Sequence, residues 1–230
     1  MNVELIAFTP NADDVCGVAA RTCVSKDIPP SGSLYGDWST SEYALRHAIQ
    51  SGHESVAEHA SFTFAVSGVS RALTHQLVRH RVASFSQQSQ RYVNMDEFAY
   101  VVPKSIMENP DAFDDYIGLM SKIRYLYEEF ASEDGYGIDI EDVRYILPNA
   151  CTTNILVTMN ARELRHFFAL RCCTRAQWEI RELADKMLEL VKPVAPTLFE
   201  NAGASCVQLG YCPEGEKKCC GKALTLNQLW

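Results

Sequence analysis

An Arg-His-Arg segment at residues 79–81 is followed within ten residues by a run of hydroxyl and amide side chains. A guanidinium group is planar and always charged, so it binds phosphate or carboxylate oxygens through two parallel hydrogen bonds. The serines and glutamines of residues 84–90 can donate to phosphate oxygens or pair with the edge of a base, and Tyr92 can stack on a ring. The segment therefore predicts a site for an anionic nucleotide.

Two stretches of this acidic chain contain no acidic residue. The chain has 29 acidic residues and a formal net charge of −8, yet none lies between Glu58 and Asp96 or between Asp142 and Glu163. Both stretches carry arginines, and local positive charge of this kind concentrates anionic ligands. The alternative is a solvated basic face whose arginines form surface ion pairs. The sequence has no glycine-rich phosphate loop, so side chains and local backbone must hold any nucleotide.

A second group of chemically active side chains is His53-Glu54 together with Glu58-His59. The spacing differs from the H-E-x-x-H pattern of zinc enzymes, and on a helix the two histidines point to different faces. We therefore expect no metal here. We expect the segment to begin a helix or to position a ligand.

The elements that must position these side chains are a mixture of helices and strands without regular β-α-β alternation. Hydrophobic periodicity predicts strands at residues 3–8, 61–68 and 152–159, and helices at residues 40–50, 70–80, 110–132, 140–147, 160–171 and 176–191. A loop is expected at residues 83–90. The expected fold class is α+β, a single compact domain of mixed helices and a β-sheet. We assign catalysis to residues 1–203 and expect a cysteine-rich tail at 204–230.

The bulk composition is that of an ordinary globular protein, with 47% hydrophobic and 22% charged residues among 230. The net negative charge argues against a nucleic-acid partner. No apolar run is long enough to span a membrane, and no basic region precedes the first apolar stretch. We therefore expect a cytoplasmic protein that binds neither nucleic acid nor membrane.

Four of the nine cysteines crowd the tail, at Cys206, Cys212, Cys219 and Cys220. An odd total and a reducing compartment argue against a disulfide framework. Three or four of these thiolates could form a zinc site, but the spacing departs from the usual pair of C-x2-4-C motifs. Free thiols in an exposed accessory tail are the favoured interpretation. A zinc-ribbon binding module would leave the arginine clusters unexplained.

Arg79-His80-Arg81, followed by seven residues and Ser89, resembles the R-H-R-x7-S signature of the flavin-dependent thymidylate synthases. Ser86 and Gln87 depart from the Asn and Glu that are common in that family. The other motifs of the family follow in the expected order, at residues 52–59, RYILP at 144–148, NAR at 160–162, LR at 170–171 and AQWE at 176–179.

The resemblance implies an α+β homotetramer with active sites at subunit interfaces, which converts dUMP to dTMP with FAD, NADPH and methylenetetrahydrofolate. The implied flavin-binding residues are Ser55, Arg79, His80, Arg81, Gln87, Asn160, Arg162 and His166, the last being Asn in some relatives. The implied dUMP-binding residues are Gln76, Arg79, Gln87, Ser89, Gln90, Arg91, Arg144 and Arg171.

Arg171 matches the family residue thought to stabilise the ionised uracil ring, and a permanently charged guanidinium suits that electrostatic role. Arg91 and Arg144 would hold the phosphate and orient the ring. Ser89 would need an adjacent base to act as a nucleophile, so we interpret it as a hydrogen-bonding ligand. No cysteine falls inside a matched motif, so a covalent thiolate route is not indicated.

Two other functions remain open from the residues. One is a different flavin- and folate-dependent uracil methyltransferase, such as one acting on RNA, but the chain is acidic and has no separate basic domain. The other is a non-catalytic nucleotide-binding protein, which would need the phosphate arginines but not the flavin-binding set.

Overall fold

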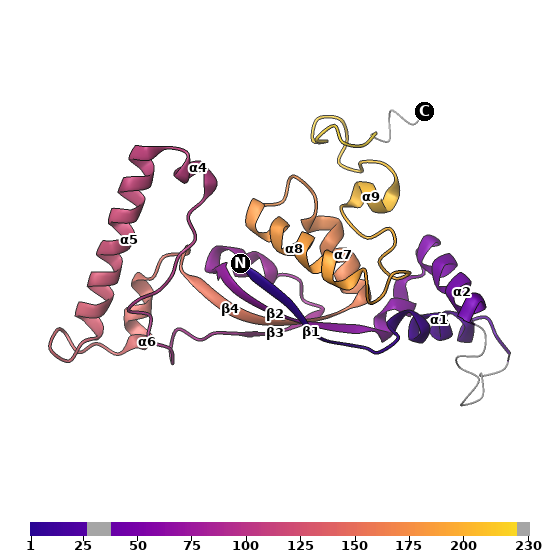
Figure 1. Ribbon diagram of the computed structural model, residues 1–230, viewed down its shortest axis with the longest axis horizontal. Helices are drawn as coiled ribbons and strands as arrows, with labels where there is room; N and C mark the ends of the chain where they lie inside the picture. Colours follow the sequence, from indigo (N-terminus) through magenta and orange to yellow (C-terminus); the bar gives the residue numbers. More distant parts are fainter. Residues whose placement is uncertain (27–37, 225–230) are drawn as a thin grey trace. The chain divides into compact units, whose positions relative to one another are not determined.

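The computed structural model describes residues 1–26 and 38–224, and it confirms the α+β class (Figure 1). Four strands form one sheet in the order β1-β2-β4-β3. Their bounds are Asn2–Phe8 for β1, Ser61–Ser70 for β2, Ala83–Gln87 for β3 and Thr152–Asn160 for β4. Along β2 and β4, buried side chains alternate with more exposed ones. This period of two is the pattern from which both strands were predicted.

The predicted loop at residues 83–90 was wrong in its first half, where the chain forms β3. β3 is last in the strand order and hydrogen-bonds to β4 alone. The N–H of Gln88 continues the pairing by donating to the carbonyl of Asn154 over 2.9 Å. An edge strand keeps one side toward solvent, so serine and glutamine side chains are tolerated there. Their low apolar content conceals the strand from a hydrophobicity pattern.

The chain forms two compact units. The first comprises Met1–Asn2, Val66–Val78 and Ser86–Ile155, and the second comprises Val3–Ala65, Arg79–Phe85 and Leu156–Trp230. Within the described residues, no helix combines the length and the apolar character needed to cross a membrane.

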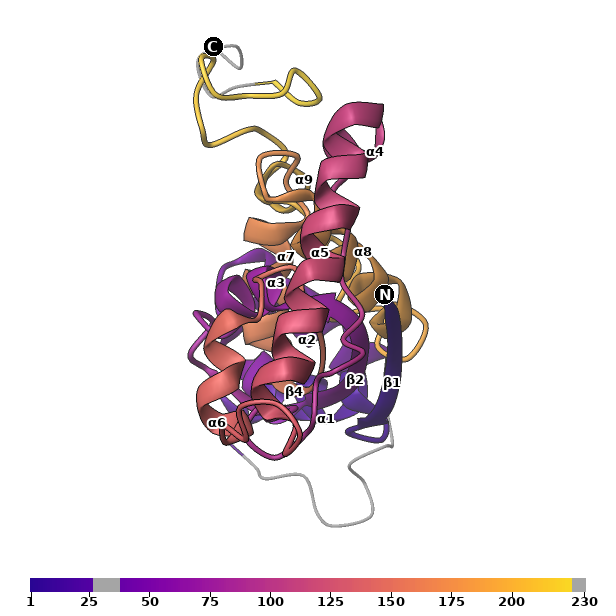
Figure 2. The same cartoon turned by 90° about the vertical axis from the view of Figure 1, so that its left-hand side faces the viewer.

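The first unit is built around the long helix α5, Pro110–Ala131, which α4 and α6 contact (Figure 2). Asn109 caps α5 by accepting the N–H of Ala112, and a proline at the first helical position favours the same start. The other helices of the unit are α3 at Arg71–Leu77, α4 at Lys104–Met107, α6 at Ile140–Val143 and the 3-10 turn η2 at Arg144–Ile146. Its core contains Met95, Phe98, Met120, Tyr127, Val143 and Cys151.

The second unit packs its helices over a core of fully buried phenylalanines, Phe62, Phe64, Phe167, Phe168 and Phe199. Its helices are α1 at Ala12–Thr22, α2 at Trp38–Gln50, η1 at Glu54–His59, α7 at Ala161–Arg171, α8 at Trp178–Val191 and α9 at Ser205–Leu209. α7 contacts η1, α8 and α9, whereas α1 contacts α2 and η1. α2, α7 and α8 were predicted, but α1 and α9 were not. α1 was missed because Asn11 forms no side-chain cap and the buried face of the helix consists mainly of small residues.

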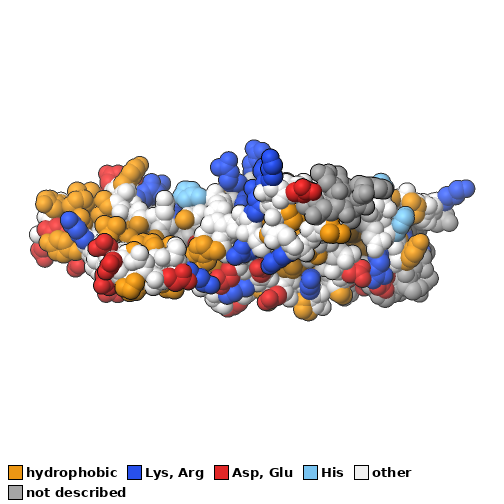
Figure 3. Space-filling model, turned by 90° about the horizontal axis from the view of Figure 1, so that it is seen from above, with side chains coloured by type: hydrophobic (Ala, Val, Ile, Leu, Met, Phe, Trp, Pro, Cys, Tyr) orange, Lys and Arg blue, Asp and Glu red, His pale blue; other side chains and the backbone are white. Residues whose placement is uncertain are grey.

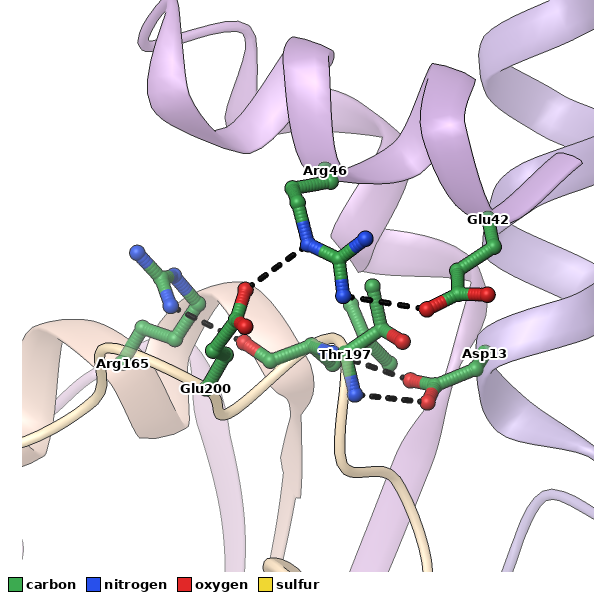
Figure 4. Close-up of polar contacts among 7 residues, drawn as sticks. Asp13, Glu42, Arg46, Arg165, Thr197 and Glu200 are labelled. Atoms are coloured by element: carbon green, nitrogen blue, oxygen red, sulfur yellow. Dashed lines mark hydrogen bonds and ion pairs between the residues drawn. The ribbon is translucent and has the colours of Figure 1, made fainter. Parts of the chain in front are cut away.

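Polar contacts attach the segment after α8 to three helices of the second unit (Figure 4). The buried Asp13 carboxylate on α1 accepts the backbone N–H groups of Thr197 at 2.7 Å and Leu198 at 2.9 Å. The Leu198 carbonyl in turn accepts from Arg165 of α7 at 2.9 Å. Arg46 of α2 donates to Glu200 at 2.9 Å. The segment is therefore held by charge-assisted hydrogen bonds as well as by its apolar contacts.

Candidate functional site

The predicted ligand residues divide between the two units. The first unit holds most of the predicted dUMP set, namely Gln76, Gln87, Ser89, Gln90, Arg91 and Arg144. The second unit holds most of the predicted flavin set together with the predicted catalytic arginine, namely Ser55, Arg79, His80, Arg81, Asn160, Arg162, His166 and Arg171. Gln87 is the predicted flavin residue that lies in the first unit. The predicted roles of these residues stay predictions, but their local surroundings are defined.

In the first unit, hydroxyl groups and one thiol hold two of the three predicted glutamines, Gln87 and Gln90. The Gln87 Nε2 lies 3.1 Å from the hydroxyl of Thr74 and 3.5 Å from that of Thr153. Gln90 contacts the buried Cys151 thiol at 3.9 Å, and Gln76 is half-buried on α3. Because these side chains are partly buried and held, they form an ordered surface of hydrogen-bonding groups.

Glu141 accepts hydrogen bonds from both arginines that are predicted to bind phosphate, Arg91 and Arg144. Its carboxylate accepts from Arg91 Nε at 2.7 Å, and its backbone carbonyl accepts from Arg144 Nε at 2.9 Å. The Arg91–Glu141 ion pair is about half exposed, and water screens exposed pairs of this kind, so the attraction is weak. A phosphate can therefore compete for Arg91. The Ser89 hydroxyl accepts the backbone N–H of Arg91 at 3.1 Å, and its contact with a substrate stays a prediction.

Arg71, at the start of α3, is a half-buried cation that the sequence analysis did not assign to the site. Burial lowers the pKa of its guanidinium, and the positive charge of Arg144 lowers it further. Its Nη1 lies 3.5 Å from the carbonyl of Gln88, so it reaches the 87–90 segment. Two neighbouring cations in one unit favour a bound anion. The sequence does carry a signal for Arg71, because it is a cationic residue in the acid-free stretch between Glu58 and Asp96.

In the second unit, η1 and α7 are joined by two ion pairs. Glu54 accepts from Arg165 at 3.0 Å, and Glu58 pairs with Arg162. The carboxylates of Glu54 and Glu58 therefore pair with arginines of α7. The exposed Ser55 lies between them on η1. Within residues 1–26 and 38–224, no three His, Cys, Asp or Glu side chains form a metal-binding group. The buried Arg165 is structural, because its other contact is the Leu198 carbonyl.

His80 is buried and uses both ring nitrogens. Its Nδ1 lies 3.2 Å from Glu163 Oε1, and its Nε2 accepts from Arg171 Nε at 3.1 Å. Phe167 packs edge-on against the ring with centroids 5.0 Å apart. Burial lowers the pKa of His80 to about 4, with further contributions from the charges of Arg171 and His166. The imidazole is therefore neutral at neutral pH, and both of its nitrogens are already hydrogen-bonded within the unit.

Three of the predicted site arginines of the second unit, Arg79, Arg81 and Arg171, adjoin this histidine in the chain or in space. Arg79 and Arg81 are exposed on either side of it in the chain. Burial lowers the pKa of Arg171, and the charge of Arg79 lowers it further, which places the two guanidinium groups near each other. On the face of the molecule that Figure 3 shows, Lys and Arg side chains lie among Asp and Glu side chains over much of the surface. Arg79 and Arg171 together make a local excess of positive charge.

Arg171 also lines a cavity of about 260 Å³ whose opposite wall comes from the tail. Cys206, Cys212 and Glu214 contribute to that wall. The tail is attached to α7 by the Ser205 hydroxyl, which donates to the Ala169 carbonyl at 3.0 Å. All nine cysteines are free thiols. No pattern in the sequence predicts that the tail lies beside Arg171.

Comparison with known proteins gives one consistent result. Residues 4–197 match the family model described as thymidylate synthase complementing protein. A flavin-dependent thymidylate synthase of Clostridium tetani is 46% identical over all of this chain and 97% of its own length. One of Geobacter sulfurreducens is 47% identical over all of this chain and 98% of its own. The matches to these two relatives include the tail, whereas the family model ends at residue 197.

A solved structure supports the same fold. The flavin-dependent thymidylate synthase ThyX from Helicobacter pylori, crystallised with FAD and dUMP, superimposes with a TM-score of 0.69. The match covers 88% of this chain and 100% of that one, at 24% identity. The α+β arrangement is therefore shared by proteins whose sequences have diverged widely.

Proposed function

This chain belongs to the thymidylate synthase complementing protein family, the flavin-dependent thymidylate synthases, and we propose that it converts dUMP to dTMP by reductive methylation. We further propose methylenetetrahydrofolate as the carbon donor, NADPH as the reductant and FAD as the cofactor. Arg171 carries this proposal. It is a half-buried guanidinium, held by His80 and close to Arg79, where negative charge on a substrate would be stabilised.

The donor groups of the second unit fit a cofactor that carries phosphates. The proposed set includes the exposed Arg79, Arg81, Arg162 and Ser55 and the half-buried Asn160. His80, His166 and Gln87 complete the proposed set. Arginine binds phosphate through paired hydrogen bonds. When bound, FAD accepts and delivers hydride, and the protein supplies its orientation.

The proposed dUMP residues divide by task. Arg91 and Arg144 hold the phosphate, with the half-buried Arg71 adding positive charge beside them. Gln76, Gln87, Ser89 and Gln90 supply hydrogen bonds to the nucleotide, and Arg79 adds charge near Arg171. Arg171 then stabilises the negative charge that builds on the uracil ring as carbon 5 becomes nucleophilic.

The purified protein is expected to be yellow and to release free FAD on denaturation, because the proposed contacts are non-covalent. Reduction of the bound flavin by NADPH and formation of dTMP from dUMP and methylenetetrahydrofolate would be followed by absorbance and chromatography. The control is the variant Glu182→Gln, purified in the same way. It alters an exposed carboxylate on α8 that pairs with Lys186. A colourless protein that cannot be reconstituted with FAD contradicts the proposal.

We also propose a homotetramer in which each active site combines residues of more than one subunit. Light scattering should give a mass about four times that of the chain. Arg91→Ala and Arg171→Ala alter different units, so mixed tetramers made from the two variants should recover part of the activity if a site takes these arginines from different subunits. Full activity in a monomeric protein would exclude the arrangement.

We assign catalysis to residues 1–203 and an accessory role to the tail, and we place the enzyme in the cytoplasm, where free cysteines persist. A chain ending at Gly203 should keep its flavin and most of its turnover. It should melt at a lower temperature, because the bond from Ser205 to Ala169 and the bond from Gln208 to the Arg165 carbonyl are lost. Loss of turnover in a tetrameric, flavin-bound truncated protein would overturn the accessory role. Stoichiometric zinc in the full chain would overturn the free-thiol interpretation.

A further inference from the structure

Glu163 is a buried acidic residue in the first turn of α7. Its position suggests that it caps its own helix, but the structure shows another contact. Asn160 caps the helix by accepting the N–H of Glu163 at 2.9 Å. A glutamate three residues after a cap commonly turns back to the cap's own backbone. Here the Glu163 carboxylate instead reaches His80, a residue 83 positions earlier in the chain. The side chain is committed to a distant partner and not to starting its own helix.

The protons that Arg171, His80 and Glu163 carry determine which atom donates in each of the two hydrogen bonds. An arginine Nε can only donate, so the His80 Nε2 that it contacts at 3.1 Å must be unprotonated. Because burial keeps His80 neutral, its single proton lies on Nδ1. That N–H donates to Glu163 Oε1. Arg171 therefore donates to His80, and His80 donates to Glu163.

We propose that Glu163 is a positioning residue that fixes the Arg171 guanidinium by setting the tautomer of His80. Without an acceptor at Nδ1, the neutral imidazole is free to carry its proton on Nε2. That N–H would face the N–H of Arg171 Nε, and the two donors would repel. With Glu163 in place, Nε2 accepts, the guanidinium plane is held, and its two terminal amino groups are available to the proposed substrate.

The surroundings show why such an arrangement would be retained. The Glu163 side chain is about 10% exposed and the His80 side chain about 4%. Burial raises the pKa of Glu163, which shows that the site disfavours its charge. A buried carboxylate next to a neutral ring costs free energy that an apolar pair would not. The cost is explained if the carboxylate holds a catalytic group in one orientation. This inference rests on the proposed function only in assigning Arg171 to the substrate.

The kinetic test uses the flavin-bound full-length enzyme with two substitutions of similar size. Glu163→Met removes the acceptor, and its kcat should fall at least about tenfold while KM for dUMP changes less than about threefold. Glu163→Gln keeps an acceptor oxygen, so its kcat should stay within about threefold of the parent. Glu182→Met removes an exposed carboxylate from α8 and should change neither parameter. Flavin content and melting temperature are measured for every variant.

The second measurement does not depend on turnover. Nitrogen NMR of the histidine-labelled holoprotein distinguishes a proton on Nδ1 from one on Nε2. His80 should show the Nδ1–H form in the parent and in Glu163→Gln, and it should change in Glu163→Met. Assignment uses the loss of one signal in His80→Gln.

The outcomes separate the two proposals. A folded Glu163→Met with parental kcat, or a folded Glu163→Gln that loses as much kcat as the methionine variant, overturns the positioning role. So does an Nε2–H tautomer in the parent, which decides the matter even if Glu163→Met does not fold. The expected tautomers in a protein that makes no dTMP would leave the hydrogen-bond chain intact and contradict the proposed function alone.

Discussion

Replacing Arg171 with alanine is expected to reduce kcat for dTMP formation about a hundredfold to a thousandfold and to leave the Kd for dUMP nearly unchanged. Removing one preorganised donor from a site of developing negative charge typically costs that much turnover. The guanidinium is half-buried and oriented by His80, so water would replace it poorly. An interaction that is stronger in the transition state than in the ground state affects kcat and not binding. The measurements are steady-state kinetics and dUMP titration of the flavin-bound enzyme.

Arg91→Ala is the matched control, since it removes the same side chain from a different setting. Arg91 is about half exposed and paired with Glu141, and its proposed partner is the phosphate, whose charge does not change during the reaction. Its loss should raise KM and Kd for dUMP while kcat stays close to the parent value. If Arg171→Ala raised KM at unchanged kcat, Arg171 would be a binding residue and the electrostatic role would be wrong.

Sequence reasoning worked where the physical cause was local. β2 and β4 alternate buried and exposed residues, and α5 begins at a capping asparagine and a proline, so all three were predicted within a few residues. β3 was missed because an edge strand requires few apolar side chains. α1 was missed because its buried side chains are small and the sequence offers no capping signal.

In the candidate site, too, residues with a local signal were identified from the sequence, and residues whose role depends on distant partners were not. Arginines are visible in a sequence because their charge is intrinsic, and the acid-free stretches drew attention to those now found near one another. Glu163 was not identified, because its role depends on His80, which is distant in the chain. Nothing local distinguishes it from a glutamate that caps its own helix. Glu141 was missed for the same reason, since its carboxylate contacts Arg91, 50 positions away.

Replacing Asp13 with alanine is expected to destabilise the protein by about 2–6 kcal/mol, because two buried backbone N–H groups lose their acceptor. The carboxylate accepts two buried backbone N–H groups, from Thr197 at 2.7 Å and Leu198 at 2.9 Å (Figure 4). Burial raises its pKa, and the two backbone bonds act in the opposite direction. Without the carboxylate, both N–H groups lose their acceptor, and each unsatisfied donor costs about 1–3 kcal/mol. Denaturant unfolding at one fixed protein concentration measures the loss.

Two further variants separate this hydrogen-bonding role from a general effect of charge. Asp14→Ala removes a carboxylate from the same first turn of α1, so it changes the interaction with the helix dipole equally, and it should cost less than about 1 kcal/mol. Asp13→Asn keeps the shape but offers a single acceptor oxygen, and its amino group would face one of the two N–H donors. It should therefore fall between the parent and Asp13→Ala. The two variants remove the same charge and differ in the backbone N–H groups left without an acceptor. Equal stabilities for Asp13→Ala and Asp14→Ala would therefore show that the two hydrogen bonds to Asp13 contribute nothing to stability.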